Sequence, residues 1–215
     1  MTSLSRRAFV TAATASLLAG CGGGHGTDRA ANSAAQQGSS TQGSSTPSGQ
    51  PSARTGVKKA HALARSAPVT LRVPAIGVDT PVMKLGLTAD GTVQVPPIAA
   101  HDRAGWYRYS PTPGQTGPSV ILGHVTVGAY GDGVFRHLAR LHKGDRIEAG
   151  LENGTTATFT VTTVRTVAKA DFPSDEVYGN TDHPELRLIT CGGTRTGTGY
   201  LDNVIVFAAL TSASP

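Results

Sequence analysis

The part of the chain that most limits its fold begins at about Ala67. From there, short runs rich in Val, Ile, Thr and Leu are separated by Gly, Pro and Asp residues at close spacing. Short runs between frequent turn signals are typical of a small β-barrel or β-sandwich. We expect strands near 69–73, 81–85, 119–124, 146–149, 157–167, 187–191 and 203–209.

Alternation within these runs supports the all-β interpretation. From Ala157 to Val164 the apolar residues fall mostly on one parity and threonines occupy the other. A strand of this kind buries one face and exposes the other. Helical spacing is confined to 133–141, where Val134, Leu138 and Leu141 predict a turn or two of helix.

The first third of the chain lacks the composition of a domain. Residues 22–66 consist mainly of Gly, Ser, Thr, Gln, Ala and Pro and include no aromatic residue. Such a segment buries too little apolar area to offset the entropy lost on ordering. We therefore expect a disordered tether at 22–66 and one folded domain at 67–215.

The N-terminus has the features of an export signal. Arg6 and Arg7 precede a short apolar run, and the pair resembles a twin-arginine signal. The segment Leu18-Ala19-Gly20-Cys21 resembles a bacterial lipobox. We expect residues 1–21 to be the signal and Cys21 to be lipidated, anchoring the domain on the extracytoplasmic face of the membrane. Plain secretion and an uncleaved anchor are the alternatives.

Charge argues against nucleic-acid binding. The chain has a formal charge of +5, but Asp28 is the only acid before residue 69, while seven Lys and Arg residues lie there. The remainder of the chain is nearly neutral, whereas a nucleic-acid binder gathers Lys and Arg on a folded face.

The second cysteine, Cys191, is a candidate nucleophile. If Cys21 is lipidated, Cys191 has no disulfide partner within the chain. It ends an apolar run and precedes two glycines, which allow a sharp turn that leaves the sulfur uncovered. His124 also ends an apolar run, so both residues are expected at a rim, where an imidazole can serve a thiolate. A buried, inert cysteine is the alternative.

Three stretches together resemble the sortase family in order and spacing. They are Leu71 to Val82, Pro113 to Val125, and Leu188-Ile189-Thr190-Cys191-Gly192-Gly193. The Cys-Gly-Gly continuation and Gly199-Tyr200-Leu201-Asp202-Asn203 are most similar to the actinobacterial class F or E sortases.

This resemblance implies a closed eight-stranded β-barrel with one or two short helices. It also implies a cysteine transpeptidase that cleaves a Thr–Gly-type bond in the sorting signal of a surface protein. The acyl group would be held as a thioacyl on Cys191 and passed to an amine at the cell envelope, such as one on a peptidoglycan precursor. A hydrolase, or a degenerate sortase that only binds peptides, is the alternative.

One residue departs from the family pattern. The resemblance places an Arg in the strand after the cysteine, and the corresponding position here is Leu201, which cannot donate a hydrogen bond. An Arg suits the oxyanion because its guanidinium is a fixed, charged fork. We expect Arg195, in the Gly- and Thr-rich loop after Cys191, to replace it, with Arg187 as the lesser candidate.

No cofactor or metal is expected. No His or Cys pair has zinc-like spacing. Acidic residues gather before the catalytic strand, where some sortases bind calcium, but their spacing is loose and indicates a solvated loop. They are Asp171, Asp175, Glu176, Asp182 and Glu185. Among the other histidines, His101 is the one we retain as a candidate neighbour of the site.

Overall fold

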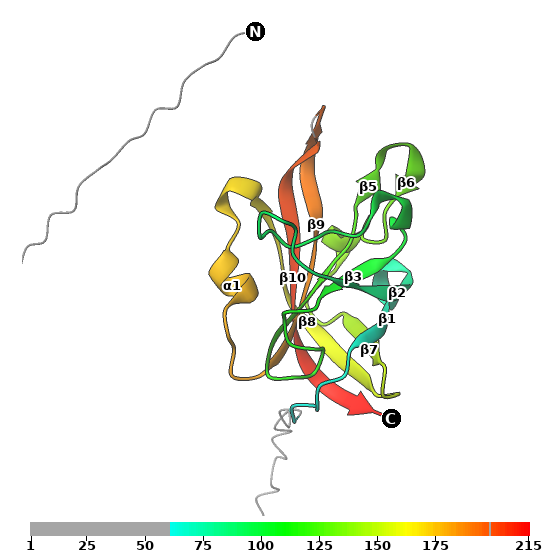
Figure 1. Ribbon diagram of the computed structural model, residues 1–215, viewed down its shortest axis with the longest axis vertical. Helices are drawn as coiled ribbons and strands as arrows, with labels where there is room; N and C mark the ends of the chain where they lie inside the picture. Colours follow the sequence, from blue (N-terminus) through cyan, green and yellow to red (C-terminus); the bar gives the residue numbers. More distant parts are fainter. Residues whose placement is uncertain (1–60, 198) are drawn as a thin grey trace, which may run out of the picture. The chain divides into compact units, whose positions relative to one another are not determined.

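The computed structural model describes residues 61–197 and 199–215, and this part of the chain forms a closed barrel. Its eight strands follow the order β1-β2-β3-β4-β9-β10-β8-β7, and β7 pairs with β1 to close it (Figure 1). The predicted closed, eight-stranded all-β fold is confirmed. The barrel strands are β1 (Pro68–Val73), β2 (Val78–Leu85), β3 (Ala104–Tyr107), β4 (Gly117–Leu122), β7 (Arg146–Leu151), β8 (Thr156–Ala168), β9 (Pro184–Thr196) and β10 (Gly199–Ser214).

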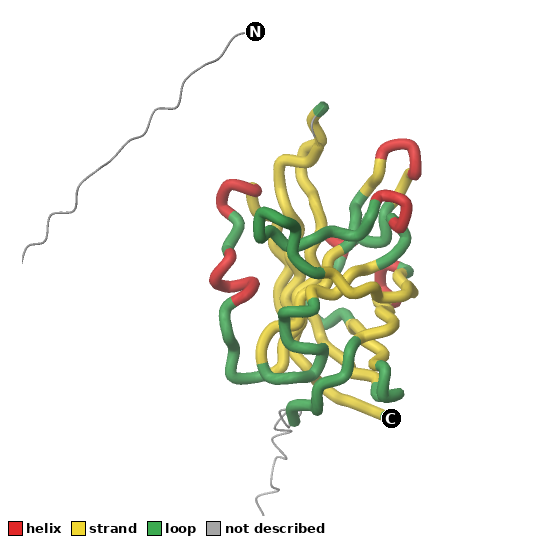
Figure 2. Tube along the Cα trace, viewed as in Figure 1, coloured by secondary structure: helices red, strands yellow, loops and turns green. Residues whose placement is uncertain are grey.

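The remaining elements are short, and strand dominates the described chain (Figure 2). A two-stranded hairpin is formed by β5 (Thr126–Val127) and β6 (Gly131–Asp132), and the described part holds one α-helix, α1 (Ser174–Tyr178). The 3-10 turns are η1 (Pro74–Ile76), η2 (Ile98–Ala100), η3 (Gly128–Tyr130), η4 (Leu138–Arg140) and η5 (Lys169–Asp171).

The turn or two of helix predicted at 133–141 is present as the 3-10 turn η4, with no α-helix in this segment. The N–H groups of Arg136, Leu138 and Arg140 donate to carbonyls three residues earlier, as in a 3-10 turn, and not four residues earlier. Leu138 is fully buried, so the spacing of apolar residues in this segment reflects burial in the core and not an α-helix.

The barrel interior is filled from every strand. Leu71, Ile121, Phe159, Leu188 and Val206 are each fully buried there. On β9 and β10 the even-numbered residues point inward, as the alternation of a strand requires.

A second, smaller cluster lies on the outside of the barrel wall. Val120, Ile189 and Ile205 form it, from β4, β9 and β10, and Val177 of α1 covers them. We call this the outer cluster. It shows that odd-numbered residues of β9 and β10 face outward, beneath α1.

Strands β4 and β9 are neighbours in the barrel and run parallel. Their paired residues, from Gly117↔Pro184 to Leu122↔Ile189, lie 67 positions apart in the sequence. The connection between them contains β5 to β8. This pairing joins the two sequence motifs that carry the candidate nucleophile and its histidine.

A segment before β1 is fastened to the barrel. In Leu63–Ala67, which we call the strap, the Leu63 N–H donates to the Gly114 carbonyl at 2.8 Å and the Ser66 N–H donates to Thr112 Oγ1 at 3.2 Å. The packed part therefore begins a few residues before Ala67. The predicted export signal, Cys21 and most of the predicted tether lie outside the described residues. Within the described part, none of the helices has the length and apolar character needed to cross a bilayer.

Candidate active site

Cys191 lies on β9 with a free, half-buried thiol. It has the same strand parity as Ile189, which belongs to the outer cluster. Side chains two residues apart on a strand share a face, so the sulfur is directed to the outer side of the wall and not into the core.

His124 reaches the same face through the parallel pairing. The Gly123 N–H donates to the Ile189 carbonyl at 3.1 Å, one step beyond the end of β4. One further step in this register brings His124 level with Cys191. Neighbouring strands lie about 4.8 Å apart, so the two side chains emerge beside one another from adjacent chains.

The ring of His124 is oriented by a backbone carbonyl. Its Nε2 lies 2.6 Å from the Pro96 oxygen. A carbonyl oxygen can only accept a hydrogen bond, so Nε2 is the donor and carries a proton. In the neutral ring Nδ1 is then the free base, available to exchange a proton with a thiol or an amine. Sequence reasoning missed Pro96, because a backbone acceptor leaves no residue-type signal.

Two glycines allow close packing around the backbone of His124. A Cβ at Gly123 would lie 2.6 Å from Phe135 Cδ2, and a Cβ at Gly133 would lie 2.3 Å from the His124 carbonyl oxygen. That oxygen accepts a hydrogen bond of 2.9 Å from the Phe135 N–H. The histidine is therefore held by neighbours that only glycine permits.

The sequence predicted that the strand would end at the glycines after Cys191. In the structure β9 continues through them to Thr196. The pairing shifts between Tyr200↔Arg195 and Asp202↔Gly192, which leaves an extra residue on β9. Gly193, with φ +71°, supplies the left-handed conformation of this bulge. The bulge therefore begins two residues after the nucleophile.

Leu201 lies on the face of Cys191. It shares strand parity with Asn203, the Cα partner of Cys191, and is 53% exposed. The position at which the family resemblance expects an Arg is thus beside the nucleophile, and it presents no hydrogen-bond donor. Asn203 is a polar residue opposite Cys191 that sequence reasoning did not single out.

Arg195 lies on β9 and not in a loop. It is exposed, and its Cα partner is Tyr200. Paired residues point to the same side of a sheet, so Arg195 shares the side of Tyr200, which is opposite to the side of Leu201 and Cys191. The Tyr200 hydroxyl is 2.5 Å from Thr126 Oγ1, which links the tip of the β9–β10 hairpin to the hairpin that follows His124. Both hairpins extend toward the same end of the domain (Figure 1).

Arg187, the lesser candidate, is enclosed away from the thiol. It is 4% exposed, pairs with Glu185, and stacks its guanidinium 4.5 Å from the Phe207 ring centroid. Four residues along a strand separate it from Cys191, about 13 Å at the usual rise. These contacts give Arg187 a structural role between β9 and α1.

The acidic residues before and at the start of β9 are partly used in ion pairs. Glu176 binds Arg165 at 2.8 Å, and Glu185 binds both Arg187 and His183. Across residues 61–197 and 199–215, no group of three or more His, Cys, Asp or Glu side chains is placed to hold a metal ion.

An aromatic wall lies on the outer face near α1. Tyr107 packs edge-on against Tyr178, which also meets Phe172. Burial raises the pKa of Tyr178 above its ordinary value, with a further contribution from Tyr107. This phenol therefore stays neutral at physiological pH.

His101, the retained candidate neighbour of the site, packs against the ring of Tyr130, with 5.6 Å between the ring centroids.

Comparison with known proteins identifies the family. Residues 71–211 match the model of the sortase domain, so the chain belongs to the sortase family. Sortases are cysteine transpeptidases that act on sorting-signal peptides of surface proteins with amine acceptors. A comparison with curated proteins gave no match.

Solved structures agree with the fold. Sortase A of Listeria monocytogenes is 22% identical, with a TM-score of 0.51, covering 69% of this chain and 90% of that chain. Sortase A of Corynebacterium diphtheriae is 21% identical, with a TM-score of 0.54, covering 71% of this chain and 64% of that chain. A sortase D5 transpeptidase of Clostridium perfringens is 24% identical, with a TM-score of 0.50, covering 68% and 79% respectively.

Proposed function

We propose that this chain cleaves a sorting-signal peptide through a thioacyl intermediate on Cys191 and transfers the acyl group to an amine. The observation that carries the proposal is the pairing of β4 with β9. It aligns a free thiol and a histidine on one outer face, although they lie 67 residues apart in the chain.

The first step forms the thioester. His124 Nδ1 takes the proton of the Cys191 thiol, and the thiolate attacks the carbonyl carbon of the scissile peptide bond. The imidazolium then gives this proton to the departing amine as the C–N bond breaks. The Pro96 carbonyl assists by holding Nε2–H, which leaves Nδ1 for this proton exchange.

The second step reverses these roles. An incoming amine attacks the thioester carbon while His124 takes its proton, and the C–S bond breaks to regenerate the thiolate. With water in place of the amine, the same steps give hydrolysis. We propose a Thr–Gly-type bond as the one cleaved, on the basis of the resemblance to class F or E sortases.

The oxyanion needs a donor that Leu201 cannot supply. We propose Arg195, because it is an exposed cation on the hairpin whose tip is tied to the segment after His124. It lies as far along β9 from Cys191 as Arg187 does, but Arg187 is buried and paired with Glu185, whereas the long, exposed side chain of Arg195 would reach the thiol around the edge of β9. The leucine at position 201 also favours the alternative function. Without a donor beside the thiol, the chain would be a degenerate sortase that holds peptides or hydrolyses them slowly.

We propose that the enzyme works on the extracytoplasmic face of the cell membrane, anchored by a lipid on Cys21. The support is the order of signal, lipobox and polar tether in the sequence. Its substrate would be a surface protein and its acceptor an amine of the envelope, such as one on a peptidoglycan precursor.

Mass spectrometry of the full chain, incubated with peptides that contain a Thr–Gly bond, tests the mechanism. An acyl adduct on Cys191 that disappears when an amine is added, with appearance of the amide product, is the expected result. Cys191→Ala should give no adduct while the thermal midpoint changes little. An adduct formed equally by Cys191→Ala would refute the assignment, and tight peptide binding with no adduct would favour the binding module.

A further inference from the structure

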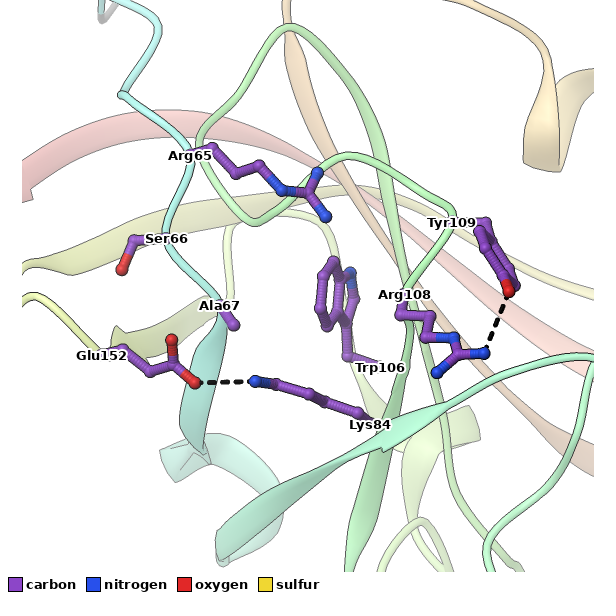
Figure 3. Close-up of a pocket in the computed structure, with 8 residues that line it drawn as sticks. All are labelled: Arg65, Ser66, Ala67, Lys84, Trp106, Arg108, Tyr109 and Glu152. Atoms are coloured by element: carbon purple, nitrogen blue, oxygen red, sulfur yellow. Dashed lines mark hydrogen bonds and ion pairs between the residues drawn. The ribbon is translucent and has the colours of Figure 1, made fainter.

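A groove of about 570 Å³ lies beside the strap, apart from the candidate active site. We call it the strap groove. Its walls come from the strap, β2, β3 and the segments after β3 and β7 (Figure 3), and none of His124, Cys191 or Arg195 contributes to it. Its lining residues are Arg65, Ser66, Ala67, Lys84, Trp106, Arg108, Tyr109 and Glu152.

The strap groove has an excess of positive charge. Lys84 is paired with Glu152, 2.9 Å from Nζ to Oε1. Arg65 and Arg108 have no ion pair with an acid of the described residues. Two guanidinium groups therefore face one groove without a counter-charge from this part of the chain.

Each guanidinium group lies over an aromatic ring. Arg65 lies 5.7 Å from the Trp106 ring centroid, and Arg108 lies 4.9 Å from the Tyr109 centroid and donates to its hydroxyl at 2.9 Å. Figure 3 shows Trp106 between the two arginines. Stacking limits the rotation of a guanidinium, so less entropy is lost when it binds an anion.

The strap is also anchored on both sides of Arg65. Leu63 bonds to Gly114, and Ser66 both donates to Thr112 and accepts a hydrogen bond of 3.1 Å from the Asn153 N–H. Arg65 is thus presented from a fixed backbone, although it lies in a segment without regular secondary structure.

We propose that the strap groove binds a phosphate group, with Arg65 and Arg108 as its ligands. A phosphate monoester carries about 1.5 to 2 negative charges at neutral pH, which matches two unpaired guanidinium groups better than a single carboxylate does. Guanidinium groups also bind phosphate oxygens in pairs. The source is a soluble phosphate ester or a phosphate headgroup at a membrane, and the two share this chemistry.

The chain carries its own reporter for this site. Trp106 is its only tryptophan and forms the wall on which Arg65 stacks. We expect a saturable change in tryptophan fluorescence when the full chain is titrated with inorganic phosphate or glycerol phosphate. Acetate at equal ionic strength should produce a much smaller change.

Four variants make the test specific. Arg65→Gln and Arg108→Gln should each weaken phosphate binding by about ten-fold or more, because each removes a charge-assisted pair. Glu152→Gln should strengthen binding by about two- to ten-fold, because it frees the charge of Lys84. Arg72→Gln, which removes an exposed arginine paired with Asp79 outside the groove, should leave binding unchanged.

A loss of folding cannot produce this pattern, because Glu152→Gln is expected to act in the opposite direction. No saturable signal, equal binding of acetate, or equal affinity in Arg65→Gln and the unaltered chain would overturn the proposal. Vesicles of phosphatidylcholine with and without phosphatidic acid separate the sources. Tighter binding to the phosphatidic acid vesicles that is lost in Arg65→Gln indicates a membrane headgroup, and binding of glycerol phosphate alone indicates a soluble ester.

Discussion

The fit of Gly133 against His124 leads to the sharpest prediction. A Cβ at Gly133 would lie 2.3 Å from the His124 carbonyl oxygen, against about 3.0 Å as the closest distance that real Cβ atoms show. The atom that the new methyl group would meet belongs to the backbone of His124. Gly133→Ala must therefore displace His124 by about 0.7 Å or separate the two segments that carry these residues.

The displacement should affect catalysis more than stability. Overpacking costs about 1–3 kcal/mol, which lowers the thermal midpoint by roughly 3–10 °C in a domain of this size. A misplacement of about 1 Å reduces rate by about 100-fold, so kcat/KM for acylation of Cys191 should fall roughly 10- to 100-fold in Gly133→Ala.

Gly197→Ala is the matched control, because a Cβ there meets nothing within 4 Å and its φ is not left-handed. Alkylation of Cys191 by a small thiol reagent, together with thermal unfolding, checks that the variant is folded and the thiol reachable. If Gly133→Ala loses the expected stability while kcat/KM stays within two-fold of the unaltered chain, His124 is not the positioned acid and base.

Four further outcomes are expected. His124→Ala should reduce the rate of acylation by about 100- to 10,000-fold, measured as adduct formation in single-turnover assays; a near-normal rate would remove the histidine from the mechanism. Arg195→Ala should lower kcat/KM by about ten-fold or more, whereas Arg187→Ala should chiefly lower the thermal midpoint; equal kinetics for Arg195→Ala and the unaltered chain would leave the oxyanion to backbone N–H groups. Tyr200→Phe removes only the hydroxyl bond to the β5–β6 hairpin and should reduce kcat with a thermal midpoint lowered by a few degrees at most; an unchanged kcat would make that bond structurally incidental. Cys21→Ser should release the protein from membranes or leave it unprocessed, and unchanged size and fractionation would contradict a lipid anchor.

Local pattern was enough for most of the fold. Seven strands were expected from alternating Val, Ile and Thr runs, and each corresponds to an observed strand. β3 was missed because its four residues include Gly105 and Trp106 and show no alternation, and it is defined by its partners β2 and β4. α1 was missed because it has only five residues and depends on Val177 packing onto the outer cluster.

The site was predictable where residue type carries the chemistry. Cys191 and His124 stand out because a thiol and an imidazole each end an apolar run. The Pro96 carbonyl and the Thr126–Tyr200 bond were not predictable, because they arise from contacts between segments far apart in the chain. Arg195 was expected in a loop because Gly and Thr surround it, but a bulge at Gly193 lets the ladder continue.

The parallel pairing of β4 with β9 also bears on when the enzyme becomes active. The segment between these strands in the sequence includes β7 and β8, and it forms a long loop that must close before the strands can pair. Contacts of such long range form only after a large loop has closed, so they belong to the slow part of folding. A partly folded chain would therefore carry its cysteine without its histidine, and peptide cleavage would begin only once the barrel had closed.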